Sequence, residues 1–166
     1  DLPTIGIITN VGTSHIELLG SQEAIAEAKG ELIRCLGPDS VAILNEDDHF
    51  VKAMSSIAKG KTVTYGIYSN ATVIGSHLRY KKDGIKFTCK CYDEVFDVFL
   101  PMIGEHNVYD ALAAIAAGRV LGVKSSKIKK GLSDFTGTPM RQEIVAFEDI
   151  VILNDAYNAN PSSMSE

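Results

Sequence analysis

Three short apolar segments separated by two helical patterns constrain the fold of this chain more than any other feature of its sequence. The segments are residues 5–8, 41–44 and 62–65, and each is typical of a buried strand. Strands that alternate with helices pair in parallel, through right-handed crossovers. The sequence therefore predicts an α/β fold with a mostly parallel sheet and flanking helices.

The two helices of this alternation have recognisable ends. The first is predicted over residues 21–36, because Ser21 is a natural N-cap and Gly37 and Pro38 stop the pattern. The second is predicted over residues 49–58. Ligands of open α/β sheets bind just beyond the carboxyl ends of strands. The polar loop between the first strand and the first helix, which contains His15 and Glu17, is therefore a candidate site.

Lys29 is unusual for its position in the first helix. It lies four residues after Ile25 and three before Leu32, which places it on or beside the inward face. A buried, unpaired ammonium group is costly, so an inward lysine usually has a partner or a function. The alternative is that Lys29 extends from the edge of the apolar stripe into solvent. Glu17 has a similar alternative as a solvated loop acid.

Two further motifs have simple structural interpretations. Residues 45–48 (NEDD) follow the second strand, where they would form a metal or ribose site or, more simply, a solvated turn before a helix. Residues 60–62 (GKT) resemble the end of a phosphate-binding loop. That motif needs a glycine at position 55, where this chain has Ser55, and it needs a strand before it and a helix after it. We reject the second motif, and expect any phosphate loop to lie upstream of Asp1.

The pattern changes to strict alternation between residues 71 and 100. It predicts three antiparallel strands over residues 73–80, 85–91 and 95–100, with Asp83 and Gly84 at the first turn. This meander is expected to be an appendage to the parallel sheet. Cys89 and Cys91 share its apolar face, so we interpret them as small core residues rather than metal ligands.

The last third of the chain continues with helices and a second pair of strands. A helix is predicted over residues 108–121 with Asn107 as its N-cap, followed by a short helix from residue 125 or 126 to 132. Residues 136–139 break the pattern and mark a boundary. Strands are predicted over residues 140–145 and 149–153, and a polar loop containing Asp155 and Tyr157 follows.

Composition sets broad limits on function. The 166 residues are 45% hydrophobic and 22% charged, as in ordinary globular proteins. A net charge of −5 argues against nucleic acid as a partner, and no apolar run approaches the ~20 residues that span a membrane. Three cysteines do not suggest a disulfide framework. We expect a cytoplasmic protein.

The chain starts without Met and stops in the first turn of a predicted helix, as a fragment of a longer protein would.

Several motifs together resemble the Mur ligase family of ATP-dependent peptide-bond-forming enzymes. Residues 9–17 (TNVGTSHIE) and 28–31 (AKGE) carry the resemblance in the first half of the chain. In that family the loop histidine binds magnesium and the helix lysine is often carbamylated, which turns a cation into a carboxylate-like group. The resemblance thus implies that His15 and carbamylated Lys29 are catalytic and bind the metal, with Glu17 as a weaker ligand.

The resemblance continues to the end of the chain. Residues 104–107 (GEHN) precede an alanine-rich helix, and residues 139–141 (PMR) and 155–161 (DAYNANP) follow. It implies a nucleotide site in which the asparagine contacts adenine. The residues that it assigns to this site are Asn107, His106, Arg141, Asp155, Tyr157 and Asn158.

The resemblance implies a function for the full-length protein. ATP and Mg²⁺ would activate the terminal carboxylate of a UDP-N-acetylmuramoyl-tripeptide as an acyl phosphate, and the amine of D-alanyl-D-alanine would attack it. Residues 1–137 would be the later part of the ATP-binding central domain, and residues 138–166 the start of the C-terminal ligase domain. We expect these residues alone to be inactive and the full-length protein to be a monomer. The alternatives are another Mur ligase, a folylpolyglutamate synthetase relative, or a non-catalytic module that keeps the fold.

Overall fold

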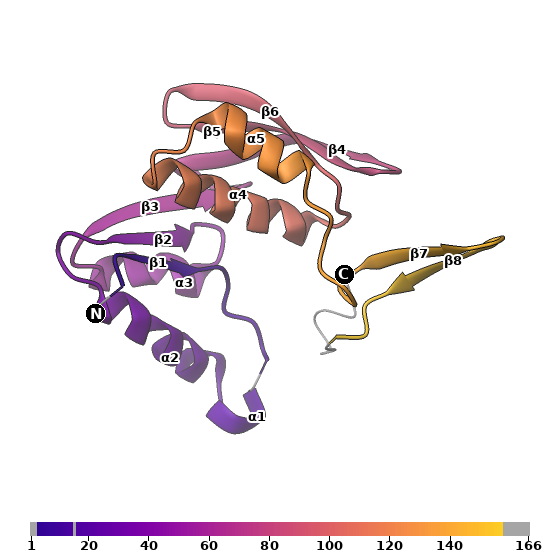
Figure 1. The fold of residues 1–166 in the computed structure, drawn as a ribbon. Coiled ribbons are helices and arrows are strands. Elements are labelled where there is room, and N and C mark those ends of the chain that lie inside the picture. The colour runs from indigo at the N-terminus through magenta and orange to yellow at the C-terminus, as the bar shows by residue number, and fades with distance from the viewer. Residues whose placement is uncertain (1–2, 15, 158–166) are drawn as a thin grey trace.

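A computed structural model of the chain describes residues 3–14 and 16–157. Within these residues six strands form one sheet in the order in which they occur along the chain (Figure 1). The strands are β1 (Ile5–Ile8), β2 (Val41–Asn45), β3 (Lys61–Gly66), β4 (Val73–Lys81), β5 (Gly84–Cys91) and β6 (Glu94–Leu100). β1, β2 and β3 pair in parallel, which confirms the α/β prediction.

The antiparallel meander is part of the main sheet rather than an appendage to it. β4 pairs in parallel with the end of β3, where Tyr65 is opposite Val73, and β5 and β6 then continue the sheet in antiparallel order. The larger of the two hydrophobic clusters extends from Ile43 of β2 across β3 to this half of the sheet. The prediction of an appendage is wrong because strands β3 and β4 are joined by a short connection that keeps them adjacent.

Helices cover both faces of the parallel half of the sheet. Ala42 and Leu44 of β2 pack with the cluster beneath α2 (Gln22–Cys35) and α3 (His49–Ala53). Ile43, which points to the other face, packs with the cluster beneath α4 (Glu105–Val120) and α5 (Ser125–Ser133). A strand buried on both faces is expected to be continuously apolar, as β2 is.

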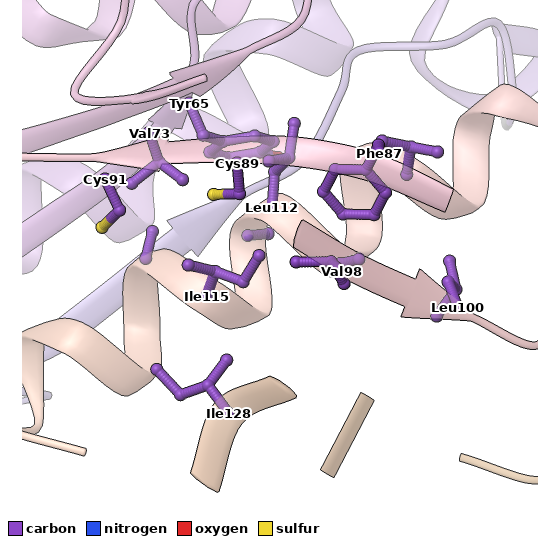
Figure 2. Close-up of a cluster of buried hydrophobic side chains, with 14 of the residues drawn as sticks. Tyr65, Val73, Phe87, Cys89, Cys91, Val98, Leu100, Leu112, Ile115 and Ile128 are labelled. Carbon is purple, nitrogen blue, oxygen red and sulfur yellow. The ribbon is translucent and has the colours of Figure 1, made fainter. Parts of the chain in front are cut away.

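The cluster beneath α4 contains the two buried cysteines. Figure 2 shows Cys89 and Cys91 among apolar side chains of the sheet, with Leu112 and Ile115 of α4 close by. Burial raises the pKa of the Cys89 thiol to about 12, so this thiol stays protonated at neutral pH. The interpretation of both cysteines as core residues is confirmed.

Two helices differ from their predicted bounds. The helix predicted over residues 49–58 is a short α3 followed by a 3-10 turn, η1 (Met54–Ile57). The Ser56 hydroxyl donates to the Ala53 carbonyl there, a local bond that competes with the helical pattern. α4 starts at Glu105 with Gly104 as its N-cap, so the prediction that Asn107 is the N-cap is wrong. Gly104 has a φ of 89°, and this conformation turns the chain so that the helix begins at Glu105, three residues earlier than predicted.

The remaining elements are a short helix between β1 and α2 and a hairpin in the last part of the described chain. α1 (Ile16–Leu19) is a single exposed turn before α2. Strands β7 (Glu143–Phe147) and β8 (Ile150–Asn154) form a separate antiparallel hairpin, which stands away from the main sheet in Figure 1. In the described part of the chain, no helix combines the length and the apolar character that crossing a membrane requires.

Candidate functional site

The loop after β1 is held in place through its backbone. The Thr9 carbonyl accepts a hydrogen bond from Asn45 Nδ2 at 2.9 Å, and the Val11 amide donates to Asp48 Oδ2 at 2.7 Å. The Val11 carbonyl in turn accepts from Gln22 Nε2 at 3.1 Å. Side chains from the end of β2, from the turn after it and from α2 therefore satisfy backbone groups that a loop would otherwise present to water. These hydrogen bonds fix the backbone conformation of the loop at the carboxyl end of β1.

Lys29 is part of the same arrangement. Its side chain is half-buried beside the inward face of α2, and Nζ donates to the Asn10 carbonyl at 2.6 Å. The lysine thus has a partner, and it also lines a pocket of about 320 Å³ together with Gly12, Ser14 and Leu19. The ammonium group of Lys29 therefore lies next to the loop and can be reached from this pocket.

The turn after β2 is structural, but it is not solvated. Asp47 accepts hydrogen bonds from the backbone amides of Ile67, Tyr68 and Ser69 at 2.6 to 3.0 Å, and from the Tyr109 hydroxyl at 2.9 Å. Partial burial opposes ionisation of Asp47, but these hydrogen bonds outweigh it and hold the pKa of the carboxyl below its ordinary value. Asp47 therefore joins the ends of β2 and β3 to α4.

Asp48 completes this turn. Its Oδ1 accepts from the amides of Phe50 and Val51, which makes it the N-cap of α3, while Oδ2 holds Val11. The carboxylate oxygens of both aspartates are thus engaged with the protein itself. The interpretation of residues 45–48 as a turn is confirmed, and no open metal or ribose site is needed to explain them.

The first turn of α4 presents polar groups next to these loops. Glycine is favoured at position 104, because its φ of 89° is one that residues with a side chain rarely adopt, and a Cβ there would also meet the imidazole of His106. Asn107 Nδ2 donates to the Ile103 carbonyl at 2.6 Å and to Gln142 Oε1 at 2.8 Å, and it lies 3.0 Å from His106 Nε2. Gln142 comes from the segment that leads into β7, so this contact joins residues 35 positions apart.

A cleft of about 1270 Å³ lies between the strand ends, the start of α4 and the segment before β7. Such a volume exceeds that of most small-ligand pockets, which hold about 300–1000 Å³. Of the residues expected to bind a nucleotide, four line the cleft: His106, Asn107, Arg141 and Asp155. Asn10, Gly12 and Ser14 line both this cleft and the smaller pocket of Lys29, so the two are neighbours.

The remaining expected site residues are placed differently. The Arg141 guanidinium lies 4.2 Å from the centre of the Tyr157 ring, so Tyr157 supports a residue of the cleft. Asp155 Oδ1 accepts from the Gln142 amide at 3.3 Å. Glu17 is exposed on α1 and is not among the residues that line either pocket. His15 and Asn158 lie outside the described residues.

The described residues do not form a metal site by themselves. Among them, no group of three His, Cys, Asp or Glu side chains is arranged to hold a metal ion. Lys29 as an ammonium repels a cation, whereas a carbamate on its Nζ would provide oxygen atoms, the ligands that Mg²⁺ prefers. Such a carbamate keeps one N–H for the Asn10 carbonyl. Among the described residues that line this pocket there is no carboxylate, so only such a modification of Lys29 would provide a negatively charged oxygen ligand for Mg²⁺.

The phosphate-loop resemblance of residues 60–62 has a structural explanation. Gly60 passes so close to the Ser40 carbonyl that a Cβ would lie 2.2 Å from that oxygen. A strand, not a helix, follows at Lys61. The glycine is needed for packing at the start of β3, which agrees with the rejection of this motif.

Comparison with known proteins decides the family. Residues 2–118 match the Mur ligase middle domain. The chain belongs to the Mur ligase family. UDP-N-acetylmuramoyl-tripeptide–D-alanyl-D-alanine ligases of Bacillus subtilis and Synechocystis are 40% and 39% identical to it over 98% of its length. The crystal structure of MurF from Acinetobacter baumannii superposes with a TM-score of 0.92 and 32% identity over 99% of this chain.

This Mur ligase chain is shorter than its relatives. It spans about a third of their length, 35% and 34% of the two curated ligases and 36% of the Acinetobacter protein. Family membership agrees with the cleft at the carboxyl ends of parallel strands, where ligands of open α/β sheets bind.

Sequence reasoning missed two residues that shape this candidate site. Asp47 was interpreted as a solvated turn residue, although four groups from the loop after β3 and from α4 converge on it. Gln142, which contacts Asn107, was not singled out. The run of polar residues after β2 was a signal for the first, whereas nothing in the local sequence marks the second.

Proposed function

We propose that this chain is part of an ATP-dependent ligase that adds D-alanyl-D-alanine to UDP-N-acetylmuramoyl-tripeptide. The observation that carries the proposal is the cleft that gathers His106, Asn107, Arg141 and Asp155 at the strand ends of a Mur ligase domain. The relatives at 39–40% identity have this activity in their names, which favours it over another Mur ligase reaction.

The residues of the cleft suggest separate tasks in binding ATP. Asn107 presents an amide at the start of α4, in a position to pair with the edge of a base. Arg141, held against the ring of Tyr157, supplies a fixed positive charge for phosphate or ribose oxygens. Asp155 and His106 complete the polar wall. Such positioning is the main contribution of a protein to phosphoryl transfer.

Lys29 and the loop after β1 would handle the reacting end of the nucleotide. Carbamylated Lys29 and His15 would hold Mg²⁺, which would offset the negative charge of the triphosphate and of the phosphoryl group in the transition state of its transfer. The hydrogen bonds from Asn45, Asp48 and Gln22 fix the backbone of this loop, so that groups on it are pre-positioned. Glu17 would assist only if α1 changes its position.

Two domains are proposed within the chain. Residues 1–137 would belong to the central domain and residues 138–166 would begin the C-terminal domain. The β7–β8 hairpin supports this division, because it pairs with no strand of the main sheet among the described residues. The full-length protein would act as a monomer in the cytoplasm, where ATP and UDP-linked precursors are available.

The proposal is tested with the full-length protein. Phosphate release from ATP is measured with Mg²⁺, UDP-N-acetylmuramoyl-tripeptide and D-alanyl-D-alanine, and the product is identified by mass spectrometry. Single amino acids replace the dipeptide in control reactions. We expect phosphate release that requires both substrates and a product enlarged by one D-alanyl-D-alanine unit. Ligation of a single amino acid instead would indicate another member of the superfamily, and no ATP-dependent ligation would favour a non-catalytic module.

A further inference from the structure

The amide of Asn107 has its donor capacity filled by the protein. An amide NH₂ group has two hydrogens, and Asn107 Nδ2 has its two shortest contacts with the Ile103 carbonyl at 2.6 Å and Gln142 Oε1 at 2.8 Å. The Ile103 carbonyl can only accept, so it determines which end of the amide faces it. Among the described residues, no donor reaches Asn107 Oδ1. The remaining hydrogen-bonding capacity of this side chain is therefore that of an acceptor.

Gln142 is held where it can make this contact. Its backbone has a φ of 48°, a left-handed conformation that is unfavourable for a residue with a side chain. Its amide donates to Asp155 Oδ1, and the neighbouring Arg141 amide donates to the Thr138 carbonyl. Residues of the cleft on both sides of Gln142 thus stabilise a strained backbone. The strain is retained at a point where the side chain reaches across the cleft to α4.

We propose that Gln142 is a positioning residue that sets the base specificity of the nucleotide site. By accepting from Asn107 Nδ2, it fixes the Asn107 amide with the carbonyl oxygen available to the cleft. That oxygen accepts from a purine with an exocyclic amino group, as adenine has, and it repels a purine with a carbonyl oxygen at the same place, as guanine has. The inference rests on the proposed function, because it assumes that the base lies against Asn107.

The loss of Gln142 has a specific structural consequence. Without Gln142, Asn107 Nδ2 would keep its hydrogen bond to the Ile103 carbonyl but would lose the one that holds its second hydrogen, so the amide would no longer be fixed from two sides. ATP would lose a well-placed acceptor, while GTP would lose a repulsive contact. The two nucleotides are therefore affected in opposite directions, which a general disturbance of the segment would not do.

The test compares ATP with GTP as substrates of the full-length protein. In Gln142→Ala we expect the KM for ATP to rise about tenfold with kcat changed by less than about twofold, and the ATP/GTP ratio of kcat/KM to fall at least about tenfold. Gln142→Glu keeps an acceptor and is expected to retain most of the ratio. Glu143→Gln is the matched control, since Glu143 contacts Met140 and Asn154 rather than Asn107. Its ratio should equal that of the wild type.

Two outcomes would overturn the inference. One is a fall in the use of both nucleotides by the same factor in Gln142→Ala, and the other is an equal change of the ratio in Glu143→Gln. Thermal melts establish that each variant is folded. Calorimetric binding of ATP and GTP gives the same ratio without turnover. If ligation is absent but binding prefers ATP and depends on Gln142, the proposed function fails and this inference stands.

Discussion

Lys29 is the residue whose chemistry has the most consequence for the proposed reaction. It donates to the Asn10 carbonyl in the structure, and the proposed carbamate would add a negative group next to the same loop. We expect Lys29→Ala to reduce ligation by the full-length protein at least about 100-fold while nucleotide binding persists, because the cleft residues are untouched. Ligation and calorimetric ATP binding are measured on the same preparation.

A second measurement on this variant separates the carbamate from the amine. Short carboxylates such as formate or acetate, added to Lys29→Ala, would restore part of the activity if the missing group is a carboxylate. Short alkylamines would restore it if the ammonium itself acts. Rescue by amines alone would contradict the carbamate, and full activity of the variant would remove Lys29 from the mechanism.

Asp47 leads to a pH-dependent prediction at the same scale. Its pKa in the folded protein is below the ordinary value of 3.8, so its contribution to stability is present above that value and is lost as pH falls through the folded pKa. Asp47→Asn places an NH₂ group among donors, and we expect a loss of about 2 kcal/mol in unfolding free energy at neutral pH. The difference from the wild type should be constant between about pH 6 and pH 8 and should shrink below about pH 4. Denaturant unfolding at these pH values measures it, and a difference independent of pH would contradict it.

Single residues also show what the sequence could not reveal. Ser21 was predicted as an N-cap and is one, because capping depends on residues three positions apart. The partners of Asp47 lie 20 or more positions away, and the contact of Asn107 with Gln142 depends on how the last segment approaches α4. A pattern of neighbouring residues contains no information on such contacts. The role of Lys29 came from family resemblance, since its spacing alone left two interpretations open.

Among the elements, β4 has an irregularity that determines which side chains reach α4. Its register with β5 shifts between Ser76 and Arg79, so His77 and Leu78 together face one residue of β5. His77 has a left-handed φ of 53°. Because this bulge accommodates one extra residue, Tyr80 pairs with Ile85 and points to the α4 face. Tyr80 and Tyr68 then donate to the two carboxylate oxygens of Glu105 at the start of α4.

The bulge predicts an unusual tolerance to deletion. Removing one residue from a strand normally moves every later side chain to the other face. Deleting His77 instead leaves Leu78 opposite Phe87 in a regular ladder, with Arg79 and Tyr80 on their present faces. We expect a change in unfolding free energy of less than about 1 kcal/mol, because the loss of backbone strain offsets the loss of a residue. Deleting Thr88 from the regular strand β5 is the control and should prevent folding. Circular dichroism melts compare the two, and equal damage by both deletions would contradict the assignment of the bulge.

The elements were the most predictable level of the structure. In residues 5–65 strands alternate with helices. A helix between two strands carries the chain back to the start of the sheet, so the next strand pairs in parallel. The start of α4 was misplaced because Gly104 adopts a left-handed conformation that no spacing rule predicts. The continuity of β4 with β3 was missed because only two residue pairs join these strands.

At the scale of the whole molecule, the β7–β8 hairpin has apolar side chains on both faces. Ile144, Val151 and Leu153 share one face, and Val145, Phe147, Ile150 and Ile152 share the other, as the pairing of the strands requires. These seven side chains are between 40% and 72% exposed. A hairpin of two strands is only marginally stable alone, and an exposed apolar edge pairs readily with other chains. The hairpin therefore needs cover that the described residues do not provide.

This exposure predicts that residues 1–166 associate when they are produced as a separate chain. We expect light scattering after size exclusion to show dimers or larger species at concentrations of about 100 μM, because apolar area is buried between copies. The double variant Ile150→Lys with Leu153→Lys places one charge on each face and should shift the population to monomer. Glu148→Lys with Asp149→Lys adds lysines at the hairpin turn without touching either face, and it should leave association unchanged. The full-length protein should be monomeric in the same measurement, since its remaining residues would cover the hairpin. A monomeric chain of residues 1–166 would show instead that the hairpin folds back onto its own sheet in solution.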